Sequence, residues 1–161
     1  MIEIIPNSHP IYVKFAVTLI VLVGVLQLAL WFSSRAAKQP GLVHGMPWLV
    51  GVGVLAVLAT LISGFIAYFT VPHDGPSHVV MSNHRNWGIL LAVVFLTGAG
   101  LFYVAARKAS MVLEALSGGL FIAALLLVAI TASQGAQLVY SHGIGVESLP
   151  NVSGEGHDHH H

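Results

Sequence analysis

The chain has 161 residues, of which 56% are hydrophobic and only 7% are charged, and six Lys and Arg balance six Asp and Glu. Soluble proteins carry about 25% charged residues, so this composition indicates an integral membrane protein. It excludes a soluble enzyme and a nucleic-acid-binding protein that depends on a basic face. The absence of cysteine excludes disulfides, thiolate metal sites, iron–sulfur clusters and covalently attached c-type haem.

Four apolar runs follow one another along the chain. A helix needs about 20 apolar residues to cross about 30 Å of hydrocarbon, and the first three runs fit one crossing each. The fourth is longer, so it must tilt, break near Gly135 or project into water. We therefore expect an all-α integral membrane protein, an up-down four-transmembrane-helix bundle over residues 1–146, followed by a disordered His-rich tail, native or a tag remnant, at 147–161. The predicted spans are 11–32, 46–69, 87–106 and 111–140.

The connections predict the orientation of the bundle. Residues 33–45 and 107–110 are short connections, whereas 70–86 is polar and its Gly75 and Pro76 favour a turn over a continued helix. Positive side chains gather in cytoplasmic loops, which favours the short connections inside and both termini in the periplasm of a bacterial inner membrane. The cations on the two sides are Arg35, Lys38, Arg107 and Lys108 against Lys14 and Arg85.

Histidines are the informative residues. Outside the tail there are six, and the topology brings five of them to the outer end, leaving His44 at the inner rim. Neutral imidazole is the commonest metal ligand and a usual axial ligand of haem. We expect two of His9, His84 and His142 to ligate haem b, with His73 in reserve, and we interpret His78 as an ordinary loop residue. Small residues that could make room for the macrocycle are Ser63, Gly64, Gly88, Ser133, Gly135 and Ala136.

Two cations accompany these histidines. Lys14 follows His9 by five residues and Arg85 directly follows His84. Either could pair with a haem propionate, and either could equally snorkel to lipid headgroups. The spans carry no deep charge and no hydrolase or nucleotide motif, which argues against a proton-coupled pump and a hydrolytic enzyme.

Three segments together resemble the DUF2231 family of predicted bacterial membrane proteins. They are His9-Pro10 with Phe15, then Asn83-His84-Arg85, and finally residues 135–146 (GAQLVYSHGIGV), which are similar to the family's G-G-x-L-V-Y-x-H-G-x-G-V ending with Ala136 at the second glycine. The resemblance covers about residues 7–146. It implies a four-helix membrane domain of a kind often found beside cytochromes, and it adds weight to His9, His84 and His142 alone.

Three hypotheses follow. The leading one is a b-type haem membrane protein that transfers electrons near the periplasmic face. It would be a subunit of a larger redox complex between the quinol pool and a periplasmic cytochrome, which this hypothesis favours over a stand-alone enzyme. The second keeps the cluster His9, His84 and His142 and replaces haem by Cu or Zn. The third is a non-catalytic membrane anchor or assembly subunit whose partners are lipid and other subunits, with histidines that only form hydrogen bonds.

Overall fold

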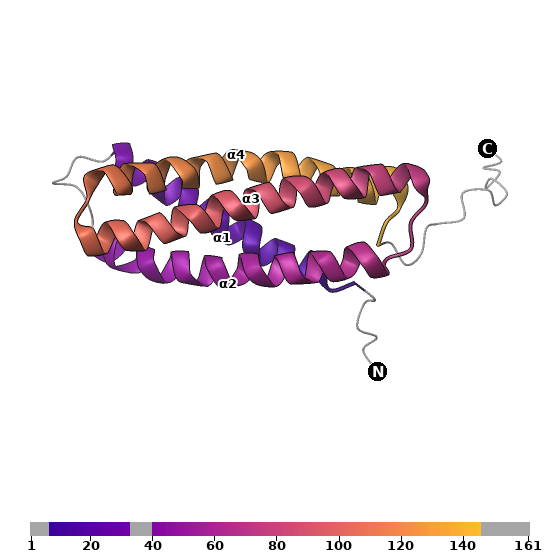
Figure 1. The fold of residues 1–161 in the computed structure, drawn as a ribbon, viewed down its shortest axis with the longest axis horizontal. Helices are drawn as coiled ribbons and strands as arrows, with labels where there is room; N and C mark the ends of the chain where they lie inside the picture. Colours follow the sequence, from indigo (N-terminus) through magenta and orange to yellow (C-terminus); the bar gives the residue numbers. More distant parts are fainter. Residues whose placement is uncertain (1–6, 33–39, 146–161) are drawn as a thin grey trace, which may run out of the picture.

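A computed structural model describes residues 7–32 and 40–145 of the chain. It contains α1 (His9–Phe32), α2 (Pro40–Thr70), α3 (Gly75–Lys108) and α4 (Met111–His142), and no strand among the residues described. The helices run along one long axis and alternate in direction (Figure 1). Each is long and apolar enough to cross a membrane, so the predicted all-α, up-down membrane bundle is confirmed. The predicted tail at 147–161 and the cations Arg35 and Lys38 lie outside the described residues.

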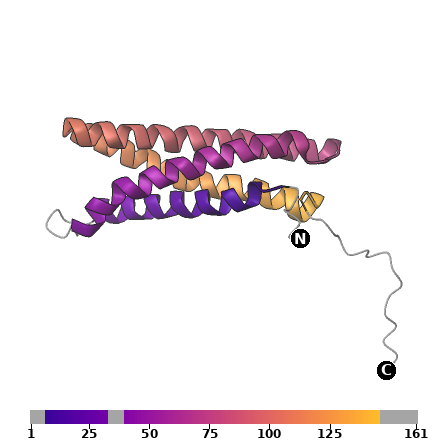
Figure 2. The same cartoon turned by 90° about the horizontal axis from the view of Figure 1, so that it is seen from below.

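The helices are arranged as a square. Extensive contacts join α1 to α2 and α4, and α3 to α2 and α4, and the largest of these interfaces is between α3 and α4. Seen from below, α2 lies in front, with α3 above it and α1 beneath it (Figure 2). Helices α1 and α3 therefore lie on a diagonal, and side chains that both direct inward can meet on the bundle axis.

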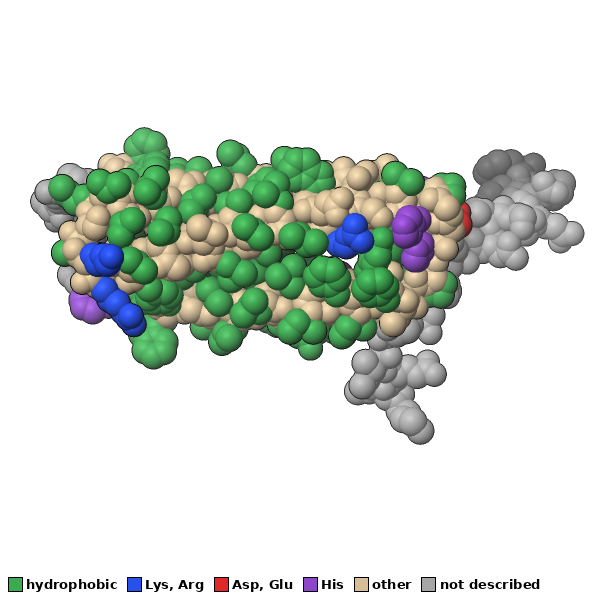
Figure 3. Space-filling view, in the orientation of Figure 1, with side chains coloured by type: hydrophobic (Ala, Val, Ile, Leu, Met, Phe, Trp, Pro, Cys, Tyr) green, Lys and Arg blue, Asp and Glu red, His purple; other side chains and the backbone are tan. Residues whose placement is uncertain are grey.

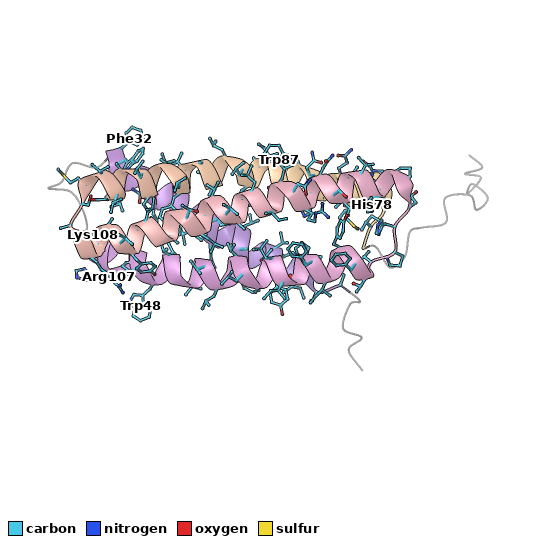
Figure 4. All side chains as sticks on the ribbon, viewed as in Figure 1. Phe32, Trp48, His78, Trp87, Arg107 and Lys108 are labelled. Atoms are coloured by element: carbon cyan, nitrogen blue, oxygen red, sulfur yellow. The ribbon has the colours of Figure 1, made fainter. Side chains whose placement is uncertain are left out.

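The two ends of the bundle differ in their side chains. We call the end with the start of α1, the connection 71–74 and the end of α4 the histidine end. The opposite end, which has Arg107 and Lys108, is called the basic end. In Figure 4 these two cations lie at the basic end with Phe32 and Trp48, while His78 lies at the histidine end. The flank between the ends is covered mainly by hydrophobic side chains (Figure 3), as lipid contact requires.

The predicted polar loop at 70–86 is wrong over most of its length, because α3 already begins at Gly75. Asp74 is the N-cap of α3 and forms a capping box with Ser77, and Pro76 lies in the first turn. Proline is well tolerated there, since it has no N–H to lose and its φ is preset. Gly75 and Pro76 thus start a helix, and only residues 71–74 connect α2 to α3.

The early start gives α3 34 residues, a length of about 51 Å at 1.5 Å per residue. This exceeds the roughly 30 Å hydrocarbon thickness, so α3 must tilt or extend past the apolar layer. Helix α4 has 32 residues and continues unbroken through Gly135. Of the three outcomes expected for its excess length, a break is therefore ruled out, and tilt or projection remains.

The middle of the bundle is apolar and closely packed. Phe95 of α3 and Phe121 of α4 are fully buried, with ring centroids 5.5 Å apart. A Cβ on Gly53 of α2 would come within 2.9 Å of Phe95 Cζ, and one on Gly98 within 3.3 Å of the Phe121 ring. Glycines let the helices approach closely, as is common in membrane bundles.

Candidate functional site

His9 is fixed at the first residue of α1. Its backbone N–H donates to Asn7 Oδ1 at 3.0 Å, and Pro10 follows in the first turn, where proline is favoured. The half-buried imidazole turns toward α2, where Nδ1 lies 3.1 Å from Ser63 Oγ. Ser63 is itself buried. The start of α1 therefore delivers an imidazole to the inside of the bundle, held by a hydrogen bond to the neighbouring helix.

His84 lies in the third turn of α3 and also points inward. Its half-buried ring reaches α4, where Nδ1 lies 3.1 Å from the backbone carbonyl oxygen of Thr131. The Thr131 hydroxyl donates to the carbonyl of Leu127 instead, so the contact with His84 is made by backbone alone. Each imidazole is thus tied to the helix next to its own.

The two imidazoles meet at the bundle axis. The ring centroids of His9 and His84 are 6.3 Å apart and their planes cross at 75°. Because α1 and α3 are diagonal, this pair comes from helices that share little other contact. His84 lies nine residues after Gly75, so the pair lies about two and a half turns from the start of α3.

The hydrogen bonds decide the tautomer of each neutral ring. The Thr131 carbonyl can only accept, so Nδ1 of His84 carries the proton. The Ser63 hydroxyl donates to the carbonyl of Thr60, so it accepts from Nδ1 of His9. In both neutral rings Nε2 is then the atom with the lone pair. Histidines that bind metals usually have this arrangement, with the other N–H donated to a carbonyl or similar acceptor.

A glycine lies against each of the two rings. A Cβ on Gly64 of α2 would come within 2.9 Å of His9 Cε1, and one on Gly135 of α4 within 3.1 Å of His84 Cε1. Both glycines were predicted to make room for a macrocycle, and in this structure they make room for the imidazoles. A Cβ on Gly88 would make only an ordinary contact, 4.0 Å from Thr131 Cγ2.

His142 does not join the pair. It is the last residue of α4 and is half-buried. Among the described residues no group of three or more His, Cys, Asp or Glu side chains could hold a metal ion. The structure therefore brings together two of the three predicted ligands, on α1 and α3.

The two predicted cations occupy different surroundings. Lys14 is exposed, and five residues place it about 140° around α1 from His9, away from the inward face. The guanidinium of Arg85 lies 4.5 Å from the centroid of the Tyr68 ring and donates through Nε and Nη2 to Asn86 Oδ1. Of the two, Arg85 is the cation that packs between α2 and α3, over the Tyr68 ring.

A second histidine cluster lies nearer the tip of the histidine end. His73 Nε2 and His78 Nδ1 are 2.8 Å apart, and the His78 ring lies 5.8 Å from that of Tyr68. Tyr68 in turn shares a hydrogen bond of 3.1 Å with Ser82. Figure 3 shows histidine side chains on the surface of the histidine end, with a cationic side chain nearby. His73 thus pairs with His78 in the structure.

Sequence reasoning missed part of this site because it treated 70–86 as a loop. In a helix that begins at Gly75, His78, Ser82 and Arg85 are three or four residues apart and share one side. The Asp74-x-x-Ser77 capping signal could have shown this. The Thr131 carbonyl has no signal in the sequence, since any residue supplies one.

Comparison with known families agrees with this architecture. A family model described as "Predicted membrane protein (DUF2231)" matches residues 6–148, which includes all four helices and both histidine clusters. No curated protein and no solved structure is similar enough to match.

Proposed function

The chain belongs to the DUF2231 family of predicted membrane proteins, and we propose that it binds a b-type haem at the histidine end and transfers electrons there. The observation that carries the proposal is the meeting of His9 and His84 on the axis of a membrane bundle, 6.3 Å between ring centroids, with both Nε2 lone pairs available. Helix bundles build cofactor sites from side chains of facing helices in this way.

The donor set suits a b-type haem, which His9 and His84 would hold. Two neutral imidazoles are a suitable pair, and each has its Nδ1–H engaged by Ser63 or Thr131, which orients the ring and raises its basicity. When bound, the haem would supply one-electron redox chemistry. The protein would contribute the ligands, their orientation and an apolar wall that excludes water below them.

Arg85 is the better of the two proposed propionate partners. It is adjacent to His84 and lies between α2 and α3, and guanidinium pairs well with carboxylate. Lys14, on the exposed face of α1, is better suited to a lipid headgroup. His73 is a ligand in reserve, because it already pairs with His78. His142 is less suited, because no group of three or more candidate ligands forms among the described residues.

The setting of the proposed site is the periplasmic side of a bacterial inner membrane. The cations Arg107 and Lys108 lie at the opposite end of the bundle (Figure 4), and cations favour the cytoplasmic side. A haem at the histidine end would then exchange electrons with a periplasmic cytochrome or with quinol in the membrane, within a larger redox assembly.

The experiment is a reduced-minus-oxidised visible spectrum of the full chain purified from membranes. We expect an α-band of haem b that is lost in His9→Gln and in His84→Gln. His44→Gln, a histidine substitution at the basic end, serves as the matched control and should keep the band. A wild-type protein supplied with haem that shows no Soret or α-band would refute the proposal.

A second candidate function is a non-catalytic membrane anchor. The specific observation in its favour is that the same hydrogen bonds join α1 to α2 and α3 to α4, so the histidines could serve only to fasten the bundle. In that case His9→Gln and His84→Gln would lower the stability of the protein and would change no absorbance.

A further inference from the structure

The His73–His78 pair has a geometry different from that of the central pair. The rings are nearly parallel, at 14°, with centroids 5.1 Å apart, while Nε2 of His73 and Nδ1 of His78 are only 2.8 Å apart. The centroid separation exceeds the nitrogen separation by about twice the distance from the centre of an imidazole to its own ring nitrogen. The two nitrogens therefore lie on the line between the ring centres. The imidazoles are therefore joined end to end, and not stacked face to face.

The protons of this pair can be assigned from its anchor. His73 Nδ1 lies 2.8 Å from the Val71 carbonyl oxygen, which can only accept, so Nδ1 carries the proton and Nε2 has the lone pair. His78 Nδ1–H then donates to His73 Nε2. One proton thus lies between two ring nitrogens that point directly at each other, at an exposed position beside the connection 71–74.

We propose that His73 and His78 together form a binding site for a soft monovalent metal ion, Cu⁺ or Ag⁺, in place of the shared proton. Two opposed nitrogen donors suit an ion that accepts linear two-fold coordination, and imidazole is a suitable ligand for copper. On binding, two metal–nitrogen bonds form and the proton of His78 moves from Nδ1 to its own Nε2, so no proton is released. The site is separate from the His9–His84 pair.

The rings must move apart only slightly. Metal–imidazole bonds are about 2 Å long, so the nitrogens would separate from 2.8 Å to about 4 Å. His73 lies in the connection between helices and is exposed, which allows this shift, while His78 is held in the first turns of α3. The Val71 carbonyl keeps the His73 ring oriented throughout.

Ligand number and charge both favour a monovalent ion over Zn²⁺. Zinc takes four ligands in a tetrahedron, and no third His, Cys, Asp or Glu within the described ranges completes such a group. The Asp74 carboxylate next to His73 attracts a cation, while Arg85, 4.5 Å from the Tyr68 ring, opposes one. These opposite charges leave little net attraction for a divalent ion.

The test is a silver titration, because Ag⁺ is redox-inert and shares the linear preference. The full chain would carry His157→Ala, His159→Ala, His160→Ala and His161→Ala, so that the tail binds no metal. We expect calorimetry to show an Ag⁺ equivalent that becomes at least about tenfold weaker in His73→Gln and in His78→Gln. His44→Gln is the matched control, and it should bind Ag⁺ as tightly as the protein that carries only the four tail substitutions.

Two further measurements keep the result interpretable if a variant is poorly folded. In the protein that carries only the four tail substitutions, Ag⁺ should shift the ring ¹⁵N resonances of His73 Nε2 and His78 Nδ1. X-ray absorption spectroscopy at the silver edge should show two nitrogen ligands. The proposal is overturned if Ag⁺ binding is unchanged in both variants, if it is lost instead in His9→Gln, or if Zn²⁺ binds as tightly as Ag⁺. It stands or falls independently of haem binding, which the visible spectrum measures.

Discussion

The middle of the bundle and its histidine end use the same packing device for different side chains. In the middle, Gly53 and Gly98 lie against the rings of Phe95 and Phe121, and at the histidine end Gly64 and Gly135 lie against the rings of His9 and His84. In each case a missing Cβ lets a ring from another helix enter. The two regions differ in the kind of ring, phenyl in the middle and imidazole at the histidine end. In both regions a glycine makes the space for it.

Phenyl and imidazole rings differ in their need for hydrogen bonds. A buried phenylalanine needs no hydrogen-bond partner, so the middle contributes van der Waals packing between the helices. A buried imidazole must have its N–H satisfied, and Ser63 and Thr131 do this for one nitrogen of each ring. The second nitrogen keeps its lone pair, and that is what a ligand can use.

The largest expected effect is loss of packing in the middle. Phe95→Ala should lower the free energy of unfolding by about 3–5 kcal/mol, because it leaves a cavity where the side chain was fully buried. Reversible unfolding in mixed detergent micelles measures this. Ring ¹⁵N resonances of His9 and His84 should stay in place. A shift of those resonances would contradict the separation of the two regions.

An intermediate effect is expected when the glycines at the histidine end are filled. Gly64→Ala places a methyl group within 2.9 Å of His9 Cε1, so the ring must move and the protein should lose about 1–3 kcal/mol of stability. Any haem absorbance should weaken with it. Gly100→Ala is the matched control, since a Cβ there meets nothing within 4 Å and alanine favours a helix over glycine. Equal effects of the two substitutions would show that Gly64 is not needed for His9.

The smallest effect is expected at the cap of α3. Hydrogen bonds from the Ser77 hydroxyl and backbone N–H hold the pKa of the Asp74 carboxyl below its usual value. Because the pKa is lowered on folding, the carboxylate stabilises the fold fully above its ordinary pKa, and this stabilisation is lost as the pH falls through the folded-state pKa. Asp74→Asn should therefore reduce the loss of stability between neutral and acidic pH, followed by circular dichroism. An unchanged pH dependence would mean that the cap contributes nothing measurable.

The sequence predicted the spans better than their ends. Apolar runs of about 20 residues show where helices cross a membrane, because the bilayer core imposes that length. Beyond the core the helices are free to continue, and local capping decides where they begin. The signal at Asp74 and Ser77 was in the sequence, but Gly75 and Pro76 were interpreted as a turn.

The histidines show that sequence-based prediction is limited for side-chain contacts as well. Topology alone was enough to bring His9 and His84 to the same end of the bundle. It could not decide that His84 meets His9 while His142 stays outside the pair, because the rotation of each helix about its axis is set by packing against its neighbours. The pairing of His73 with His78 depended on the start of α3 in the same way.

By itself, the sequence determined that this protein spans a membrane, because 56% hydrophobic residues with 7% charged ones cannot cover a soluble surface. Its four apolar runs determined that four helices do so. Only the tertiary structure decided which imidazoles touch and which nitrogen of each is left with a lone pair. Those outcomes depend on contacts between helices far apart in the chain, such as His9 with Ser63 and His84 with the carbonyl of Thr131. Such contacts follow from how whole helices pack, and no local pattern encodes them.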